Sequence, residues 1–194
     1  MPKQNNDKIR PFVEVQQAAN KDIIENLELR LQEMYRIADE NFLLIQKIIN
    51  FDHELMACKT VRQVLNTVRE NFNCVFNMPY NILKIIVEPK ASIRIADVDR
   101  VNDLDLIESI KSVKKPVTGT KCIHPGLYDW FDAHVRVESF LHLPLVAQDN
   151  YLGLLLVGHT DPDYFSENAP TDYVEMMAKS VAITLNRILG QSKR

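Results

Sequence analysis

Two neighbouring segments in the second half of the chain are apolar on both of their alternating faces. The first runs from Phe140 to Ala147 and the second from Tyr151 to Gly158. Strands that are apolar on both faces lie inside a sheet that is covered on both sides. The link 148–150 between them is short and polar, and its Asp and Asn residues tolerate the positive φ angles of tight hairpin turns. The pattern therefore predicts an antiparallel hairpin at the centre of a sheet.

The segment after the hairpin predicts a long helix from Pro170 to Leu189. Proline suits the first turn of a helix, where its missing N–H costs nothing, and Gly190 suits the end. One narrow stripe of this helix is polar and includes Asn186, whereas most of its other positions are apolar. An apolar arc this wide indicates cover on two sides, by the sheet and by another helix or another subunit.

Residues 13–57, near the start of the chain, follow a helical pattern. Its positions at alternating spacings of three and four are Ile24, Leu27, Leu31, Met34, Ala38, Asn41, Ile45 and Ile48. Such a heptad seam is typical of a helix that pairs with a second helix, and a buried Asn such as Asn41 can set register and oligomer state. We therefore expect a dimerisation arm that forms a parallel homodimer. The alternative is that the arm folds back on its own domain.

The positions that flank this seam change along the arm. The early ones are charged, as at Glu28 and Arg30, and the later ones are apolar, as at Phe42 and Leu44. The second half therefore has a wide apolar face, which predicts contact with more than one neighbour, as in a four-helix bundle. The natural extra neighbour is the wide face of helix 170–189.

The remaining segments predict a mixed domain between the two long helices. Residues 1–12 are polar and expected to be disordered, the globular domain is expected at 58–190, and residues 191–194 form a tail. Inside the domain we first expect a helix at 60–71, capped by Thr60, and strands at 80–87 and 92–96. A helix within 97–115 follows, with Leu104, Ile107 and Ile110 pointing inward. The last expected elements before the hairpin are a short strand or loop at 116–120 and a helical turn at 126–131. This order predicts the α/β (α+β) class, with a central antiparallel sheet and helices on both faces.

Several short motifs resemble a known family. The segments 153–155, 158–161, Phe165 and 171–173 are similar, in order and spacing, to a bacterial GAF-like family catalogued as domain of unknown function 484, within the GAF domain superfamily. With a further match at 38–42, the resemblance covers roughly residues 13–190. It implies a GAF-like domain whose ligand pocket lies on one face of the sheet, beneath the connection Ala96–Val137.

This connection and the neighbouring strands contain the candidates for lining such a pocket. They are Tyr80, Cys122, His124, Tyr128, Trp130, Phe131, His142 and Tyr151. Aromatic rings with one or two polar groups describe many small-molecule sites. The alternative is that these rings only cap the core of the domain, so that side chains fill a closed, vestigial pocket.

Charge and composition narrow the possible functions. The 23 basic and 26 acidic residues leave a net charge of −3, which argues against a general nucleic-acid surface. No apolar run approaches the roughly 20 residues that span a bilayer, and residues 1–10 lack the apolar core of a signal peptide. The three cysteines have no paired spacing, which is usual in a reducing compartment. We therefore expect a cytoplasmic protein with no membrane or nucleic-acid partner.

The sequence supports a catalytic or a metal-binding role less well than a ligand-binding role. Cys122 and His124 could form a thiolate–imidazole pair, but no second cysteine lies near them in the chain, so a thiol redox enzyme is a distant alternative. The histidines lack the close helical spacing of strong zinc sites, and no nucleotide-binding motif occurs, so we expect no metal and no cofactor.

The pattern as a whole favours a non-enzymatic regulatory or small-molecule-sensing module that acts as a homodimer. Its ligand is unknown, and a separate protein is a possible output partner. The alternative function is that of a structural scaffold dimer with a closed pocket.

Overall fold

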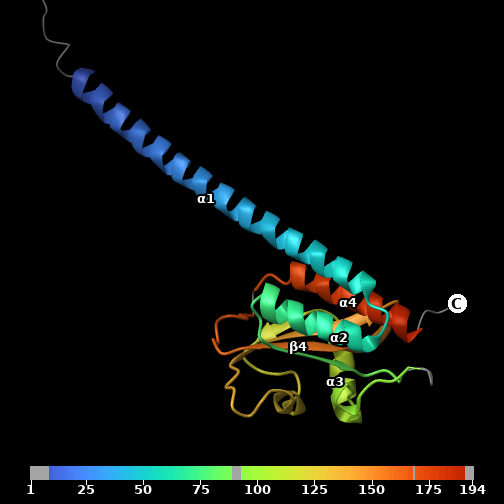
Figure 1. The fold of residues 1–194 in the computed structure, drawn as a ribbon. Helices are drawn as coiled ribbons and strands as arrows, with labels where there is room; N and C mark the ends of the chain where they lie inside the picture. Colours follow the sequence, from blue (N-terminus) through green and yellow to red (C-terminus); the bar gives the residue numbers. More distant parts are fainter. Residues whose placement is uncertain (1–8, 89–92, 168, 191–194) are drawn as a thin grey trace, which may run out of the picture. The chain divides into compact units, whose positions relative to one another are not determined.

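The structure, a computed structural model, describes residues 9–88, 93–167 and 169–190. The expected tail at 191–194, and residues 1–8 of the expected disordered segment, lie outside these ranges. The elements are α1 (Ile9–Ala57), α2 (Val61–Glu70), β1 (Tyr80–Ile85), α3 (Leu104–Ser112), β2 (Val117–Gly119), β3 (Ser139–Ala147), β4 (Asn150–His159) and α4 (Asp172–Leu189), with short helical turns η1 (Asn71–Val75), η2 (Asp97–Asp99) and η3 (Pro125–Trp130) (Figure 1). The predicted mixed class, with helices and one antiparallel sheet, is confirmed.

The predicted hairpin forms the centre of the sheet. The strand order is β1-β4-β3-β2, and every neighbouring pair is antiparallel. Between β3 and β4, Gln148 and Asp149 adopt positive φ angles of 51° and 65°, as a tight turn requires. The register then places His142 opposite Leu156.

Helices cover both faces of this sheet, as the two-sided hydrophobicity of the hairpin requires. Figure 1 shows α2 and α4 on one side of the strands and α3 on the other. Leu154 and Leu156 pack with α3, and His142 lies opposite Leu156 and therefore on the same face. The alternate residues of β3, which include the fully buried Leu141 and Leu143, point toward the α2–α4 layer.

The ends of two helices match the sequence prediction. Thr60 Oγ1 accepts a hydrogen bond from the backbone N–H of Gln63 at 3.2 Å, and Gln63 Oε1 accepts one from the N–H of Thr60 at 3.1 Å. This capping box satisfies two of the amide groups that the start of α2 leaves unpaired. Gly190 ends α4 in the left-handed conformation, with φ at 65°.

The prediction of a strand at 92–96 is wrong for residues 93–96, the part of it that the structure describes. Residues 93–96 have no regular structure, although Ile93 and Ile95 alternate with polar or small residues as in a strand. The outer edge of β1 instead receives the segment that follows, because the N–H of Val101 donates to the carbonyl of Ile85 at 2.9 Å. Ile95 is half-buried and lines a cavity together with residues of α2.

The helix predicted within 97–115 is α3, at Leu104–Ser112, but one of the three residues predicted to point inward is wrong. Asp103 accepts hydrogen bonds from the N–H groups of Asp105 and Leu106 and so begins α3 at Leu104. Leu104 is 80% exposed, whereas Leu106 and Ile110 are buried. The inward stripe is therefore spaced by four from Leu106, and Leu104 lies outside it.

Helix α1 begins at Ile9, four residues before the expected start at Val13. The chain divides between Lys47 and Ile48 into two compact units, and α1 contributes to both. In the first unit the apolar seam residues are 42–67% exposed, and they are Ile24, Leu27, Leu31, Met34 and Ile45. Ile48 is only 4% exposed and belongs to the core of the second unit, so the exposed seam ends at Ile45.

Helix α4 has one buried and one exposed apolar face. Its sheet side is buried, whereas Met176 and Ile183 are 56% and 59% exposed. Asn186, which the sequence places on the polar stripe, is buried, and its Nδ2 donates to Gln148 Oε1 at 3.5 Å. The expected wide apolar arc is therefore present, and the described residues of this chain cover only one of its two sides.

Gly153 provides a test of the central strand pairing. A Cβ at this position would lie 2.2 Å from the backbone carbonyl oxygen of Lys84 in β1, which a side-chain movement cannot relieve. We expect Gly153→Ala to lower the free energy of unfolding by about 1–3 kcal/mol, as overpacked positions do. Urea denaturation followed by circular dichroism measures this loss.

Gly126→Ala is the matched control. Its Cβ would lie 3.2 Å from Nδ1 of His124, a side-chain atom that can shift, so we expect a loss below about 1 kcal/mol. Equal losses for the two variants would contradict the close approach of β1 and β4 at Gly153.

Candidate functional site

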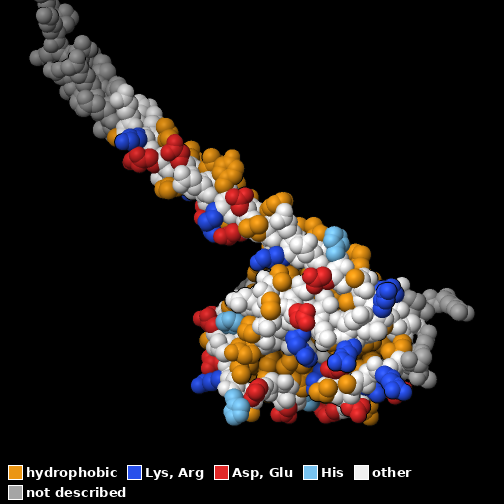
Figure 2. Space-filling view, viewed as in Figure 1, with side chains coloured by type: hydrophobic (Ala, Val, Ile, Leu, Met, Phe, Trp, Pro, Cys, Tyr) orange, Lys and Arg blue, Asp and Glu red, His pale blue; other side chains and the backbone are white. Residues whose placement is uncertain are grey.

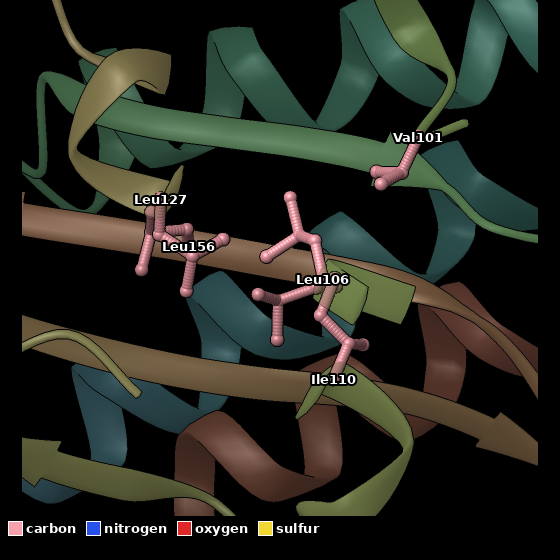
Figure 3. Packing of buried hydrophobic residues seen from close by; sticks show 6 residues of the cluster. Val101, Leu106, Ile110, Leu127 and Leu156 are labelled. Atoms are coloured by element: carbon pink, nitrogen blue, oxygen red, sulfur yellow. The ribbon is translucent and has the colours of Figure 1, made fainter. Parts of the chain in front are cut away.

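The connection between β1 and β3 covers one face of the sheet with a packed apolar cluster. Its buried members are Val101, Leu106, Ile110, Leu127, Leu154 and Leu156. Figure 3 shows Leu106 and Ile110 of α3, and Leu127 of η3, over the strand that carries Leu156. Side chains from the connection therefore occupy much of the space above this face.

The aromatic candidates gather around Phe140 on the same face. The ring of Tyr128 lies edge-on to Phe140 with centroids 5.3 Å apart, and Phe131 lies 5.9 Å away. A Cβ on the neighbouring Gly158 would be 2.5 Å from Cγ1 of Val137 and 2.9 Å from Cε1 of Phe131. At this point the connection packs directly onto the backbone of β4, which matches the closed form of the pocket more closely than an open one.

His142 is fully buried beneath the connection and links three segments. Its Nδ1 lies 3.2 Å from the carbonyl oxygen of Val117 in β2, and its Nε2 accepts a hydrogen bond from the N–H of Ile123 at 3.4 Å. A neutral ring with its proton on Nδ1 satisfies both contacts. Burial lowers the pKa of His142, and the carbonyl of Val117 partly opposes this shift. His142 thus holds β2 and the segment 122–123 against β3 in the neutral form.

Cys122 and His124 do not form the pair that a thiol enzyme needs. The Nδ1 of His124 accepts a hydrogen bond from the N–H of Gly126 at 3.0 Å, so its Nε2 is the donor to Asp105, 3.1 Å away. Burial raises the pKa of the Cys122 thiol to about 12, which disfavours the reactive thiolate. This environment argues against the thiol-redox alternative.

The remaining candidates, Trp130 of η3, Tyr80 of β1 and Tyr151 of β4, lie in different places. The Nζ of Lys84 lies 4.9 Å from the centre of the Trp130 ring, and burial lowers the pKa of Lys84 while the charge of Asp99 opposes the shift. Tyr80 pairs with Gly158 and so lies at the Phe140 end of β4. Tyr151 is at the other end of β4, roughly 20 Å away at the rise of a strand, so it does not join this group.

Cavities of about 370, 340 and 230 Å³ occur among the described residues, and the eight candidates line none of these three. The one of about 370 Å³ lies between α2 and residues 94–99. Its lining residues are Val61, Arg62, Leu65, Asn66, Arg69, Arg94, Ile95, Ala96, Val98 and Asp99. Sequence analysis missed this cavity, although the spacing of seven between Arg62 and Arg69 places both on one face of α2.

The described residues also bear on metal binding and on membrane insertion. Within the described ranges, no three His, Cys, Asp or Glu side chains are grouped so that they could hold a metal ion. The helices in these ranges include none that is both long and apolar enough to cross a membrane.

The fold defines the class of this protein, and comparisons with known proteins then place it in a family. The GAF domain of an Acinetobacter phosphoenolpyruvate-protein phosphotransferase has a similar structure, with a TM-score of 0.57 and 12% identity over 77% of this chain and 96% of that one. The corresponding GAF domain from Coxiella burnetii gives a TM-score of 0.49 and 15% identity over 77% and 94%. This is a GAF-like domain preceded by a long helix.

The particular family follows from the sequence comparison. The model of the family described as "Protein of unknown function, DUF484" matches residues 1–189, so the chain belongs to that family. The resemblance seen in the motifs is thereby confirmed. A comparison with curated proteins finds no match.

The buried neutral His142 predicts a pH dependence of stability. Its pKa is lower in the folded chain than in the unfolded chain, so the unfolded chain takes up the proton first as the pH falls below about 6.5. The contribution to stability is complete above that pH and decreases as the pH falls toward the folded pKa. We expect the melting temperature to fall between pH 7 and about pH 5.5, and His142→Gln to reduce that fall.

His134→Gln is the control for this measurement, because His134 is an exposed histidine. Differential scanning calorimetry of the three proteins gives the comparison. An unchanged pH profile in His142→Gln, together with a flatter one in His134→Gln, would contradict the role of the buried ring.

Proposed function

We propose that this chain is a non-enzymatic, homodimeric regulatory module of the GAF type, which acts in the cytoplasm and responds to a small molecule. The observation that carries the proposal is the apolar seam of α1, which is exposed along most of its length in a chain with a GAF-like domain. Exposed apolar stripes at heptad spacing need a partner helix. A second copy of the same seam is complementary to it and places Asn41 opposite Asn41.

The helices of the second unit support a larger interface of the same kind. Ile49 and Met56 of α1 are exposed, as are Met176 and Ile183 of α4. The two helices are joined locally, because Arg187 of α4 donates to the carbonyl of Cys58, just after α1, at 2.9 Å. Four helices from two copies would bury these side chains together, as in a four-helix bundle.

The same bundle offers a route for a signal. A ligand that binds two arrangements of the dimer with different affinity shifts the population between them, and the helices shared by the two copies transmit the change. A separate protein then receives the signal as the output partner.

A scaffold dimer with a closed pocket is the second candidate. It is favoured by the close packing of Phe131 and Val137 over Gly158, where the resemblance implies a ligand. The two candidates share the dimer and differ in whether a small molecule binds.

A charge on the seam tests the dimer. We expect Leu31→Glu to convert the dimer into a monomer at micromolar concentration, because it places like charges in an apolar interface. Gln32→Glu introduces the same residue one position off the seam and should leave the dimer intact. Sedimentation equilibrium gives the masses of the two variants and of the wild-type protein. A monomeric wild-type protein would contradict the proposed dimer.

Native mass spectrometry of the freshly purified protein, followed by denaturation, tests the sensing role. A dimer that releases a defined small molecule supports the sensor and identifies the chemical class of its ligand. A dimer without a released molecule shifts the proposal toward the scaffold.

A further inference from the structure

We propose that the cavity between α2 and residues 94–99 is a binding site for a small organic phosphate. The site is distinct from the pocket that the resemblance implies, since it is lined partly by α2, which lies on the opposite side of the sheet from α3 (Figure 1). All of its lining residues belong to the second unit of the chain. The proposal names a ligand class for the sensing function, but the binding itself rests on the cavity alone.

Charge is the first argument for an anionic ligand. Arg62, Arg69 and Arg94 line the cavity, and Asp99 is the one acidic residue among the lining residues. The whole chain carries a net charge of −3, so this local excess of positive charge runs against the composition. Figure 2, in the same view as Figure 1, shows Lys and Arg side chains gathered over α2 and the segment that follows β1.

The three arginines are available to a ligand. In residues 9–88, 93–167 and 169–190, no ion pair joins their guanidinium groups to a carboxylate. Asp99 acts instead on Lys84, since its charge opposes the lowering of the Lys84 pKa. Arginines without acidic partners around a concavity can each bind an anion through two parallel N–H donors.

The shape of the cavity favours a small molecule over a polymer. A volume of about 370 Å³ falls at the lower end of the range for small-molecule sites. Val61, Leu65, Ile95 and Val98 form apolar wall, and Asn66 adds an amide. The matching ligand therefore combines an anionic group with a compact apolar body.

A phosphate monoester fits the arginines better than a single carboxylate. At neutral pH it carries a charge between about −1.5 and −2 on three acceptor oxygens, whereas a carboxylate carries one charge on two oxygens. Three guanidinium groups therefore match the charge and the acceptor number of the phosphate group. The location on α2 also connects the site to the proposed dimer, because α2 follows α1 after only residues 58–60.

Isothermal titration calorimetry of the full chain with phenyl phosphate tests this proposal. Phenyl phosphate presents both parts of the inferred ligand, whereas benzoate keeps the ring and replaces the phosphate by a carboxylate. We expect phenyl phosphate to bind with a dissociation constant of about 1 mM or lower, and benzoate to bind at least about tenfold more weakly.

Arginine variants place the binding in the cavity. Arg69→Gln and Arg94→Gln should each weaken phenyl phosphate binding about tenfold or more, because each removes a charged two-donor contact. Both side chains are exposed, so these variants should fold, which circular dichroism checks. Arg136→Gln is the matched control, since Arg136 pairs with Glu138 at 2.7 Å outside the cavity and should change the dissociation constant less than about twofold.

The outcomes separate this proposal from the proposed function. Absence of phenyl phosphate binding, equal binding of benzoate, or equal effects of Arg69→Gln and Arg136→Gln would each overturn the phosphate site. None of these results changes the mass of the dimer or the release of another molecule in native mass spectrometry. Conversely, a monomeric protein that binds phenyl phosphate through Arg69 and Arg94 would overturn the dimer and leave the site in place.

Discussion

The burial of the β3–β4 hairpin on both of its faces is the constraint on which the rest of this structure depends. Two strands that are apolar on both sides need a layer above and a layer below. Helices α2 and α4 supply one layer, and the connection that contains α3 supplies the other. The backbone of Lys84 in β1 lies so close to Gly153 in β4 that a side chain at position 153 would clash with it. The pairing of β1 with β4 therefore requires a glycine at this position.

The same constraint bears on where a ligand can bind. The connection must cover the apolar face of β4, and it does so by packing Phe131 and Val137 directly over Gly158. Side chains thus occupy the face on which the family resemblance implies a pocket. An arginine-lined cavity remains between α2 and residues 94–99, a segment that follows the edge strand β1.

Two of the helices, α4 and α1, leave apolar side chains exposed. Helix α4 buries one side on the sheet and leaves Met176 and Ile183 exposed, and α1 leaves most of its seam exposed. In a small chain, apolar surface of this kind is usually an interaction site. The proposed dimer would bury this surface, and α2, which lines the arginine-lined cavity, follows α1 after residues 58–60.

The sequence by itself determined the elements whose signals are local. The two-sided hairpin, the Thr60 cap, the Gly190 stop and the heptad seam each depend on residues close together in the chain, and so does the motif pattern of the family. Only the tertiary structure decided that residues 93–96 are not a strand, that Leu104 points outward and that Arg94 meets Arg62 and Arg69 across a cavity. These features depend on which distant segment occupies a sheet edge or a helix face. Periodicity in one segment carries no information about that choice, because it reports how a segment is buried and not what buries it.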